Sequence, residues 1–168
     1  MPSPQGDGTG KPFGIAATGN GVTIVTAATG SSTSYKLADL VTVYKALPAA
    51  YRPQATWMMH PDDLASLAGL ADTAGGLILP SLQFDPPSLF ARPVVLNSDL
   101  ATPAANGKSL VLADFKSAYG IRRVNGIGLQ RQDELHSDSG QIGWKAFSRV
   151  DGRVLLADAA RILAHSAT

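Results

Sequence analysis

The chain has 168 residues and a formal net charge of +1 at pH 7, from 14 basic and 13 acidic side chains. This is the length of one domain, and the balanced charge leaves no broad basic face for a nucleic-acid backbone. The absence of cysteine excludes disulfide bonds, thiolate metal ligands and a cysteine nucleophile. With no apolar run of about 18 residues and no signal-peptide pattern, we expect a soluble protein made inside the cell, with no membrane partner.

Charged residues make up only 16% of the chain, against about 25% in a typical protein. A surface this poor in charge suits burial against other subunits. A GC-rich genome that favours Ala, Gly and Pro codons explains the same composition, so both explanations stay open.

The first part of the chain is predicted to hold one strand and one helix. Residues 1–35 are rich in Gly, Thr and Ser, and the β-branched residues at 22–26 predict a strand. We expect this segment to form an extended arm that rests on a neighbour. Apolar residues at helical spacing predict a helix over 36–47, with Ser34 as its N-cap and Pro48 at its end.

A buried strand is expected at 55–59, followed directly by a second helix. Pro61 suits the first helical position, and Asp62 and Asp63 lie where carboxylates favour the positive end of the helix dipole. Gly75 is expected to end this helix.

Short apolar runs separated by turns predict mainly strands in the second half. The expected strands are 93–96, 109–113, 118–124, 126–130, 142–150 and 154–156, with a final strand or helix at 159–164. The pair Gly126 and Gly128 is interpreted as a hairpin turn. Helix, strand, helix and then many strands, without βαβ alternation, predict an α+β fold with a mixed or antiparallel sheet flanked by helices.

The Gly-rich segment 6–11 does not predict a phosphate-binding loop. Pro12 follows Lys11, where such a loop has Ser or Thr, and no strand precedes the segment. A tight turn whose glycines adopt positive φ is the better interpretation.

The three histidines do not predict a catalytic site. His60, a neighbouring aspartate and a serine can be drawn as a triad, but no Gly-x-Ser-x-Gly elbow accompanies them. The position of His60 before a helix that begins with Pro61 predicts a capping or packing role. We expect His165 to lie in a disordered tail.

The acidic loop at 133–138 is the most metal-like cluster, with oxygen ligands from Asp133, Glu134 and Asp138 and the imidazole of His136. It lacks a second histidine and the spacing of an EF-hand, so a solvated charged hairpin is favoured. Glu134 is the only glutamate, which excludes a pair of glutamates for acid/base catalysis.

The neighbouring side chains Trp57, Met58 and Met59 could line a ligand pocket, but at strand spacing they are better explained as core. We therefore predict no catalytic, cofactor-binding or metal-ligating residue, and a structural protein rather than an enzyme.

Six segments, in order along the chain, resemble motifs of the major capsid proteins of tailed bacteriophages of the HK97 type. The most informative contains a Tyr-Arg-x-x-Ala-x-Trp turn from Tyr51 to Trp57, and another carries the Asp-Phe-x-x-Ala-Tyr pattern from Asp114 to Tyr119. The six segments are 6–15, 47–67, 77–82, 89–95, 113–119 and 140–152.

The resemblance implies the C-terminal half of such a subunit: the axial domain and part of the peripheral domain. It divides the chain into an extended arm (1–35), an axial α+β core (36–140) and returning strands of the peripheral region with a tail (141–168). The arm, E-loop and spine helix of a complete subunit have no counterpart here, so we expect weak or no assembly of this chain alone.

The function implied is that of a structural subunit, or a truncated fragment of one, in the icosahedral capsid of a phage or prophage. The expected location is the virion, after synthesis in the bacterial cytoplasm. Its expected partners are other copies of itself in pentameric and hexameric capsomers, scaffold or portal proteins, and packaged DNA held without sequence specificity. Loops 72–90 and 99–108 are expected to face the capsomer axis.

Some family members cross-link subunits through an E-loop lysine and an asparagine in the C-terminal strand, with a nearby glutamate. Residues 139–152 contain neither Asn nor Glu, so we predict no isopeptide bond. Gene-transfer particles and encapsulin-type compartments share this fold and stay open as alternatives. A small enzyme or ligand-binding domain that uses the 133–138 loop and His60 is the alternative from another functional class.

Overall fold

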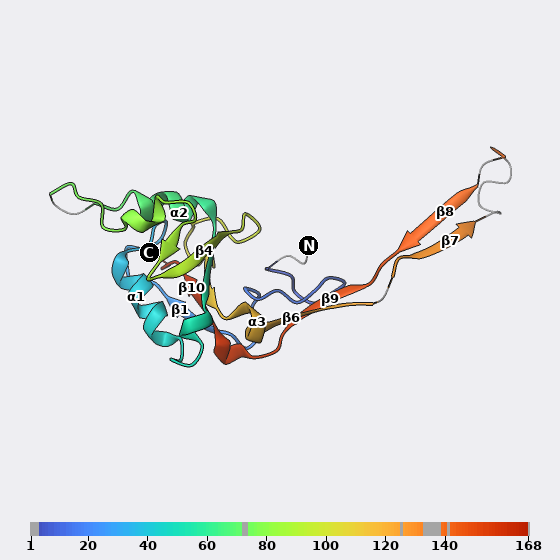
Figure 1. Cartoon of the computed structure of the whole chain (residues 1–168), viewed down its shortest axis with the longest axis horizontal. Helices are drawn as coiled ribbons and strands as arrows, with labels where there is room; N and C mark the ends of the chain where they lie inside the picture. Colours follow the sequence, from blue (N-terminus) through green and yellow to red (C-terminus); the bar gives the residue numbers. More distant parts are fainter. Residues whose placement is uncertain (1–3, 72–73, 125, 133–138, 141, 168) are drawn as a thin grey trace.

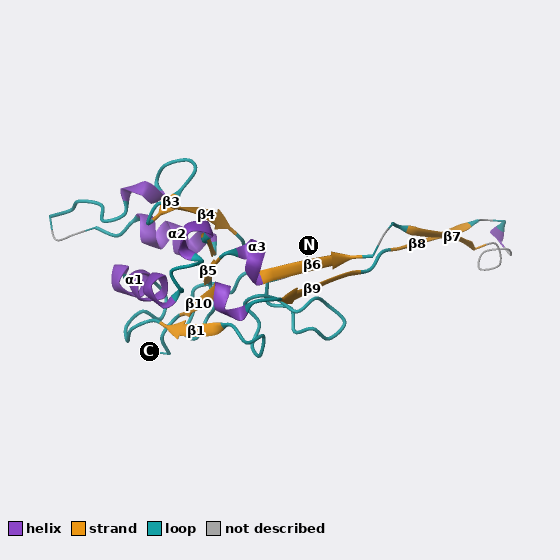
Figure 2. Cartoon of the chain, turned by 60° about the horizontal axis from the view of Figure 1, so that its bottom comes forward, coloured by secondary structure: helices purple, strands orange, loops and turns teal. Residues whose placement is uncertain are grey.

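The computed structural model describes residues 4–71, 74–124, 126–132, 139–140 and 142–167. They form two regions: a layered sheet domain and a long two-stranded ribbon that extends away from it (Figure 1). The ribbon leaves the sheet domain where the short helix α3 (Phe115–Ala118) lies (Figure 2).

The sheet domain is built on six strands in the order β1-β10-β5-β2-β4-β3. The β1–β10 and β2–β4 pairs are parallel, and the β10–β5, β5–β2 and β4–β3 pairs are antiparallel. The predicted α+β class with a mixed sheet is therefore confirmed. The strands are β1 (Thr23–Thr26), β2 (Thr56–Met59), β3 (Ser88–Leu89), β4 (Arg92–Leu96), β5 (Leu110–Ala113) and β10 (Ala160–Ala164).

One face of the sheet packs against helices α1 (Leu37–Ala46) and α2 (Pro61–Ala68). Side chains alternate between the two faces of a strand, and Leu110 and Leu112 of β5 point to the helices whereas Val111 and Ala113 point away. The helices thus cover a continuous apolar layer.

Both helices begin and end close to where local signals place them, with two corrections. Lys36, not Ser34, is the N-cap residue of α1, and its backbone N–H donates to the Asp39 carboxylate at 2.9 Å. Helix α2 ends at Ala68, with Gly69 as its C-cap, well before Gly75. The backbone N–H of Gly69 donates to the carbonyl of Ala65 at 3.2 Å and closes the last turn of the helix.

The other face of the sheet is covered by the chain itself. Ile15, Ala16 and Val22 pack with Leu100 against Ile162 and its neighbours on this face. The predicted arm therefore rests on its own sheet, and β1 pairs with β10 at the sheet edge. Burial of these side chains favours this arrangement over an extended arm in solvent.

The ribbon consists of two antiparallel pairs joined end to end. Strand β6 (Tyr119–Arg123) pairs with β9 (Val150–Val154), and β7 (Gly128–Gln132) pairs with β8 (Gly143–Phe147). The segment predicted as one strand at 142–150 is divided into two. Gly126 does not form a hairpin turn, because β6 and β7 pair with different strands; it lies, at φ 79°, in the connection that continues one side of the ribbon.

The base of the ribbon is tied to the N-terminal segment. The backbone N–H of Phe13 donates to the carbonyl of Gly152 at 2.9 Å, and the Tyr119 hydroxyl donates to the carbonyl of Phe13 at 3.0 Å. These two bonds connect the ribbon to the segment that covers the sheet.

No helix among the described residues has both the length and the apolar composition to cross a membrane.

Candidate functional site

Large exposed apolar side chains gather on the ribbon. Their exposed fractions reach 62% for Ile127, 66% for Leu129 and 63% for Trp144. Monomeric soluble proteins seldom expose contiguous apolar surface of this kind unless another molecule covers it. The ribbon is therefore the candidate functional surface of this chain.

The outer half of the ribbon has one largely apolar face. Leu129 lies opposite Ala146, and Arg131 lies opposite Trp144; residues directly opposite one another share a face. The alternation continues to Ile127 and Ile142, which flank the strands. This set, Ile127, Leu129, Ile142 and Trp144, is called the apolar ribbon face below.

The opposite side of the same strands is mixed, with polar groups and the exposed ring of Phe147. Gln130 lies opposite Lys145, and Gly128 lies opposite Phe147, whose ring occupies the space where a side chain at Gly128 would stand. The four ribbon strands hold five basic residues and one acidic residue, Asp151. These four strands are thus apolar and basic, although the chain as a whole is nearly neutral.

The structure confirms the capping role predicted for His60. It is the N-cap of α2, and its Nδ1 accepts a hydrogen bond from the backbone N–H of Asp62 at 3.2 Å. The ring is nearly buried, and Nδ1 lies 3.4 Å from the Asp62 carboxylate. His60 therefore stabilises the start of a helix.

The predicted acidic cluster at 133–138 lies outside the described residues. Among the residues that are described, no group of three or more His, Cys, Asp or Glu side chains could hold a metal ion. In segment 6–11, Gly8 and Gly10 have φ of 80° and 69°, as the tight-turn interpretation predicts.

Trp57 and Met59 are fully buried in the layer between the sheet and the helices, and the Trp57 indole N–H donates to the carbonyl of Leu89 at 3.0 Å. Met58 points to the other face and packs there. These side chains are core, as predicted.

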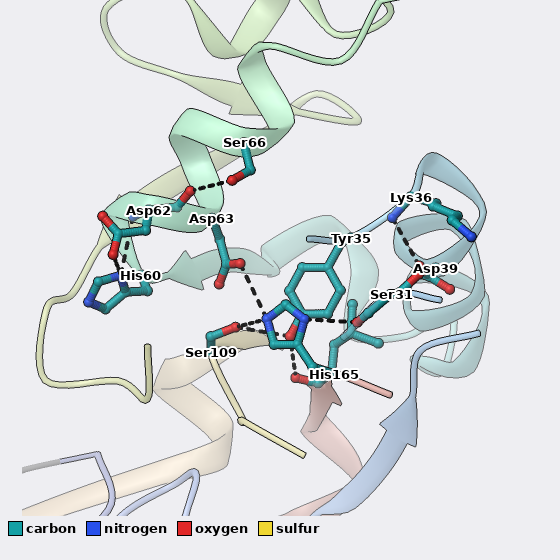
Figure 3. A network of polar contacts seen from close by, with 11 residues as sticks. Ser31, Tyr35, Lys36, Asp39, His60, Asp62, Asp63, Ser66, Ser109 and His165 are labelled. Carbon is teal, nitrogen blue, oxygen red and sulfur yellow. Dashed lines mark hydrogen bonds and ion pairs between the residues drawn. The ribbon is translucent and has the colours of Figure 1, made fainter. Parts of the chain in front are cut away.

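The prediction for His165 was wrong. Its side chain is fully buried, stacked on Tyr35 with ring centroids 4.0 Å apart, and its Nε2 lies 2.9 Å from the Ser109 Oγ (Figure 3). Asp63 lies on the far side of the same nitrogen, with Oδ1 at 3.4 Å. A polar ring at the end of a strand is buried here because the fold surrounds it with hydrogen-bonding groups.

Ser109, His165 and Asp63 are the residue types of a hydrolytic triad, but their arrangement does not fit one. In a triad the carboxylate holds one ring nitrogen and the serine holds the other. Here Ser109 and Asp63 share Nε2, and Nδ1 faces the carbonyl oxygen of Ser31 at 3.0 Å. All three side chains are fully buried, so a substrate could not reach the serine.

The two loops predicted to face the capsomer axis, 72–90 and 99–108, lie in different parts of the molecule. Loop 99–108 contacts the N-terminal segment: the Gln5 side-chain amide donates to the carbonyl of Asp99 at 3.1 Å, and Lys108 Nζ donates to the Thr18 hydroxyl at 2.8 Å. The described part of the connection after α2 projects from the end of the molecule opposite the ribbon (Figure 1).

The apolar ribbon face was missed at the level of sequence. The signal was present as the alternation of Ile127, Leu129 and Arg131 and of Ile142, Trp144 and Ala146. Such alternation indicates a strand with one apolar face, but it does not say whether the chain itself covers that face.

Residues 5–164 match the family model that is described as the phage capsid family. The chain belongs to the phage capsid family. No curated protein sequence matches it.

The solved structures that share this fold agree with the family match. The chain is similar to a structure titled "Capsid of empty GTA particle computed with C5 symmetry", with a TM-score of 0.80 and 25% identity over 96% of this chain and 59% of that one. It also resembles the structure from Gordonia phage Cozz, at TM-score 0.61 and 14% identity over 90% of this chain and 52% of that one.

A third similar structure is a virus-like particle from Pyrococcus furiosus, at TM-score 0.51 and 11% identity over 85% of this chain and 56% of that one. The chain thus spans less than two thirds of the length of each of these proteins. Together with the family match, these structures confirm the resemblance to HK97-type capsid proteins.

Proposed function

We propose that this chain is part of the structural subunit of an icosahedral phage or prophage shell, and that it functions by binding other copies rather than by catalysis. Membership of the phage capsid family and the fold shared with capsid chains support this proposal. The observation that carries it in the molecule itself is the apolar ribbon face. The enzyme alternative has no supporting observation among the described residues.

The ribbon suits a contact between unlike surfaces. An isolated two-stranded ribbon is marginally stable in water, so one that presents isoleucine, leucine and tryptophan to solvent gains from being covered. Contact of the ribbon with a different surface of the next copy would cover this face, and repeated contacts of that kind close into rings.

The remaining predictions for the whole subunit are retained as proposals: pentameric and hexameric capsomers, scaffold or portal partners, non-specific contact with packaged DNA, and a place in the virion after synthesis in the bacterial cytoplasm. The segment around 74–79, which projects from the sheet domain, is proposed to face the capsomer axis. Loop 99–108 is left out of that role because it contacts residues 5 and 18.

The division into arm (1–35), axial core (36–140) and peripheral strands (141–168) is proposed with two adjustments. Strand β10 belongs with the axial part, because it lies between β1 and β5 in the sheet. Strands β6 and β7 belong with the peripheral part, because they pair only with β9 and β8.

Light scattering coupled to size-exclusion chromatography, at two well-separated concentrations, tests the proposal. The wild-type chain is expected to show weak, concentration-dependent association. A double variant, Leu129→Ser with Trp144→Ser, is expected to elute as a monomer, because it removes apolar surface from the contact.

The matched control is Gln130→Ser with Lys145→Ser, a directly opposed pair on the other face of the same strands. It is expected to associate as the wild type does. A strictly monomeric wild type, or equal association of both double variants, contradicts a contact made by the apolar ribbon face.

A further inference from the structure

The Asp63 carboxylate and the His165 ring lie next to each other inside the sheet domain, with Oδ1 3.4 Å from Nε2. Both side chains are fully buried, and they come from distant parts of the chain: Asp63 from the first turn of α2, and His165 from the residue after β10. Neither carboxylate oxygen of Asp63 has a hydrogen-bond partner among the described residues. A buried carboxylate without donors is costly unless a positive charge faces it.

The first ring proton of His165 is assigned by its neighbour. Nδ1 lies 3.0 Å from the carbonyl oxygen of Ser31. A carbonyl oxygen can only accept a hydrogen bond, so Nδ1 must carry a proton and donate it.

The second ring proton follows from a chain of donors (Figure 3). The Tyr35 hydroxyl donates its single proton to the carbonyl of Leu163 at 3.0 Å. In the 3.0 Å contact between Tyr35 and Ser109, the serine hydroxyl must therefore be the donor. Ser109 then has no proton left for His165, and in their 2.9 Å contact the ring Nε2 is the donor.

We propose that His165 is held as a buried imidazolium ion against the Asp63 carboxylate, and that this pair is a proton-dependent lock between the C-terminal strand and helix α2. In this state each of the donors named above has an acceptor, and Nε2–H also points its charge at Asp63. The lock connects the last strand of the sheet to the helix layer that covers it.

Removal of the proton from Nε2 changes the network. Ser109 then turns its hydroxyl toward Nε2, Tyr35 turns toward Ser109, and the bond from Tyr35 to Leu163 is lost. The Asp63 carboxylate is left buried beside a nitrogen lone pair. The native state is weakened because the carboxylate has no remaining positive partner.

The other ionisable groups around the pair do not replace that charge. Asp39 lies beyond Ser31, whose hydroxyl donates to it at 2.9 Å. His60 and Asp62 face each other at the start of α2, and Lys108 is bound to Thr18. Burial raises the pKa of Tyr35, and the Asp63 charge raises it further, so its hydroxyl remains a donor at neutral pH.

Nitrogen NMR of the wild-type protein tests the charge state directly. Two-bond proton–nitrogen correlation of the histidine rings distinguishes an imidazolium, with two equivalent protonated nitrogens, from a neutral ring with one. Variants His60→Gln and His136→Gln assign the three ring signals. At about pH 7.5, where a free histidine is neutral, His165 is expected to show the imidazolium pattern; a neutral ring protonated only at Nδ1 would overturn the proposal.

Unfolding of matched variants at neutral pH tests the lock. Asp63→Asn removes the charge that faces the buried imidazolium, so its unfolding constant is expected to rise, whereas Asp62→Asn, the exposed neighbour on α2, should unfold as the wild type does. Equal unfolding constants for Asp63→Asn and wild type contradict the lock; if Asp63→Asn does not fold, the NMR result on the wild type decides.

Discussion

The two tryptophans show how differently the sheet domain and the ribbon are built. Trp57 is fully buried between sheet and helices, with its indole N–H bonded to Leu89, whereas the Trp144 side chain is 63% exposed on the ribbon. The sheet domain buries most of its large apolar side chains in two layers, one on each face of the sheet. The ribbon presents apolar groups that nothing in the described chain covers, as the proposed contact with another copy requires.

The largest expected effect is the difference in the free energy of unfolding between substitutions at the two tryptophans. Trp57→Ala should lower the free energy of unfolding by about 3–5 kcal/mol, because it leaves a cavity and an unpaired carbonyl. Trp144→Ala should change it by less than about 0.5 kcal/mol in the monomer. Urea unfolding followed by circular dichroism measures both, and equal losses would remove the distinction between the regions.

A smaller effect concerns the polar centre of the sheet domain. Tyr35→Phe should cost about 1–2 kcal/mol at neutral pH, because the bond to the Leu163 carbonyl is lost. Since burial raises the pKa of Tyr35 above its ordinary value of 10.0, the native state retains a proton that the unfolded chain releases. The wild type should therefore lose stability as pH rises above 10.0.

Unfolding of wild type and Tyr35→Phe at neutral and alkaline pH checks this sign. The difference in the free energy of unfolding between the wild type and Tyr35→Phe should narrow as pH rises. Tyr44→Phe serves as the control for removal of one phenol hydroxyl from the same domain. A gap that stays constant would contradict the assignment of the raised pKa to Tyr35.

The smallest effect is expected where the two regions join. Tyr119→Phe removes the hydroxyl that donates to the Phe13 carbonyl and should cost about 1 kcal/mol. Hydrogen exchange is the sharper measurement: amides of β6 and β9 should exchange faster, while those of β5 and β10 should not. Faster exchange throughout the sheet would show that the ribbon base and the sheet open together.

Patterns of neighbouring residues were sufficient to predict a helix or strand where one face of the segment is buried. The apolar spacing of Leu37, Leu40 and Tyr44 predicted α1. Pro61 and His60 predicted the start of α2, and the apolar run at 109–113 predicted a strand. In each case neighbouring residues in the chain determine the backbone conformation and the buried side. The motif resemblance led to the family for the same reason, because those motifs mark such segments.

The amino-acid sequence by itself determined the helices, most of the strands, the α+β class and the capsid resemblance. Only the tertiary structure decided which strands pair and what covers each side chain. Strand β6 pairs with β9 rather than β7, and His165, in a polar stretch at the end of the chain, is buried by Tyr35, Ser109 and Asp63. These outcomes depend on contacts between residues far apart in the chain, which local propensity does not encode.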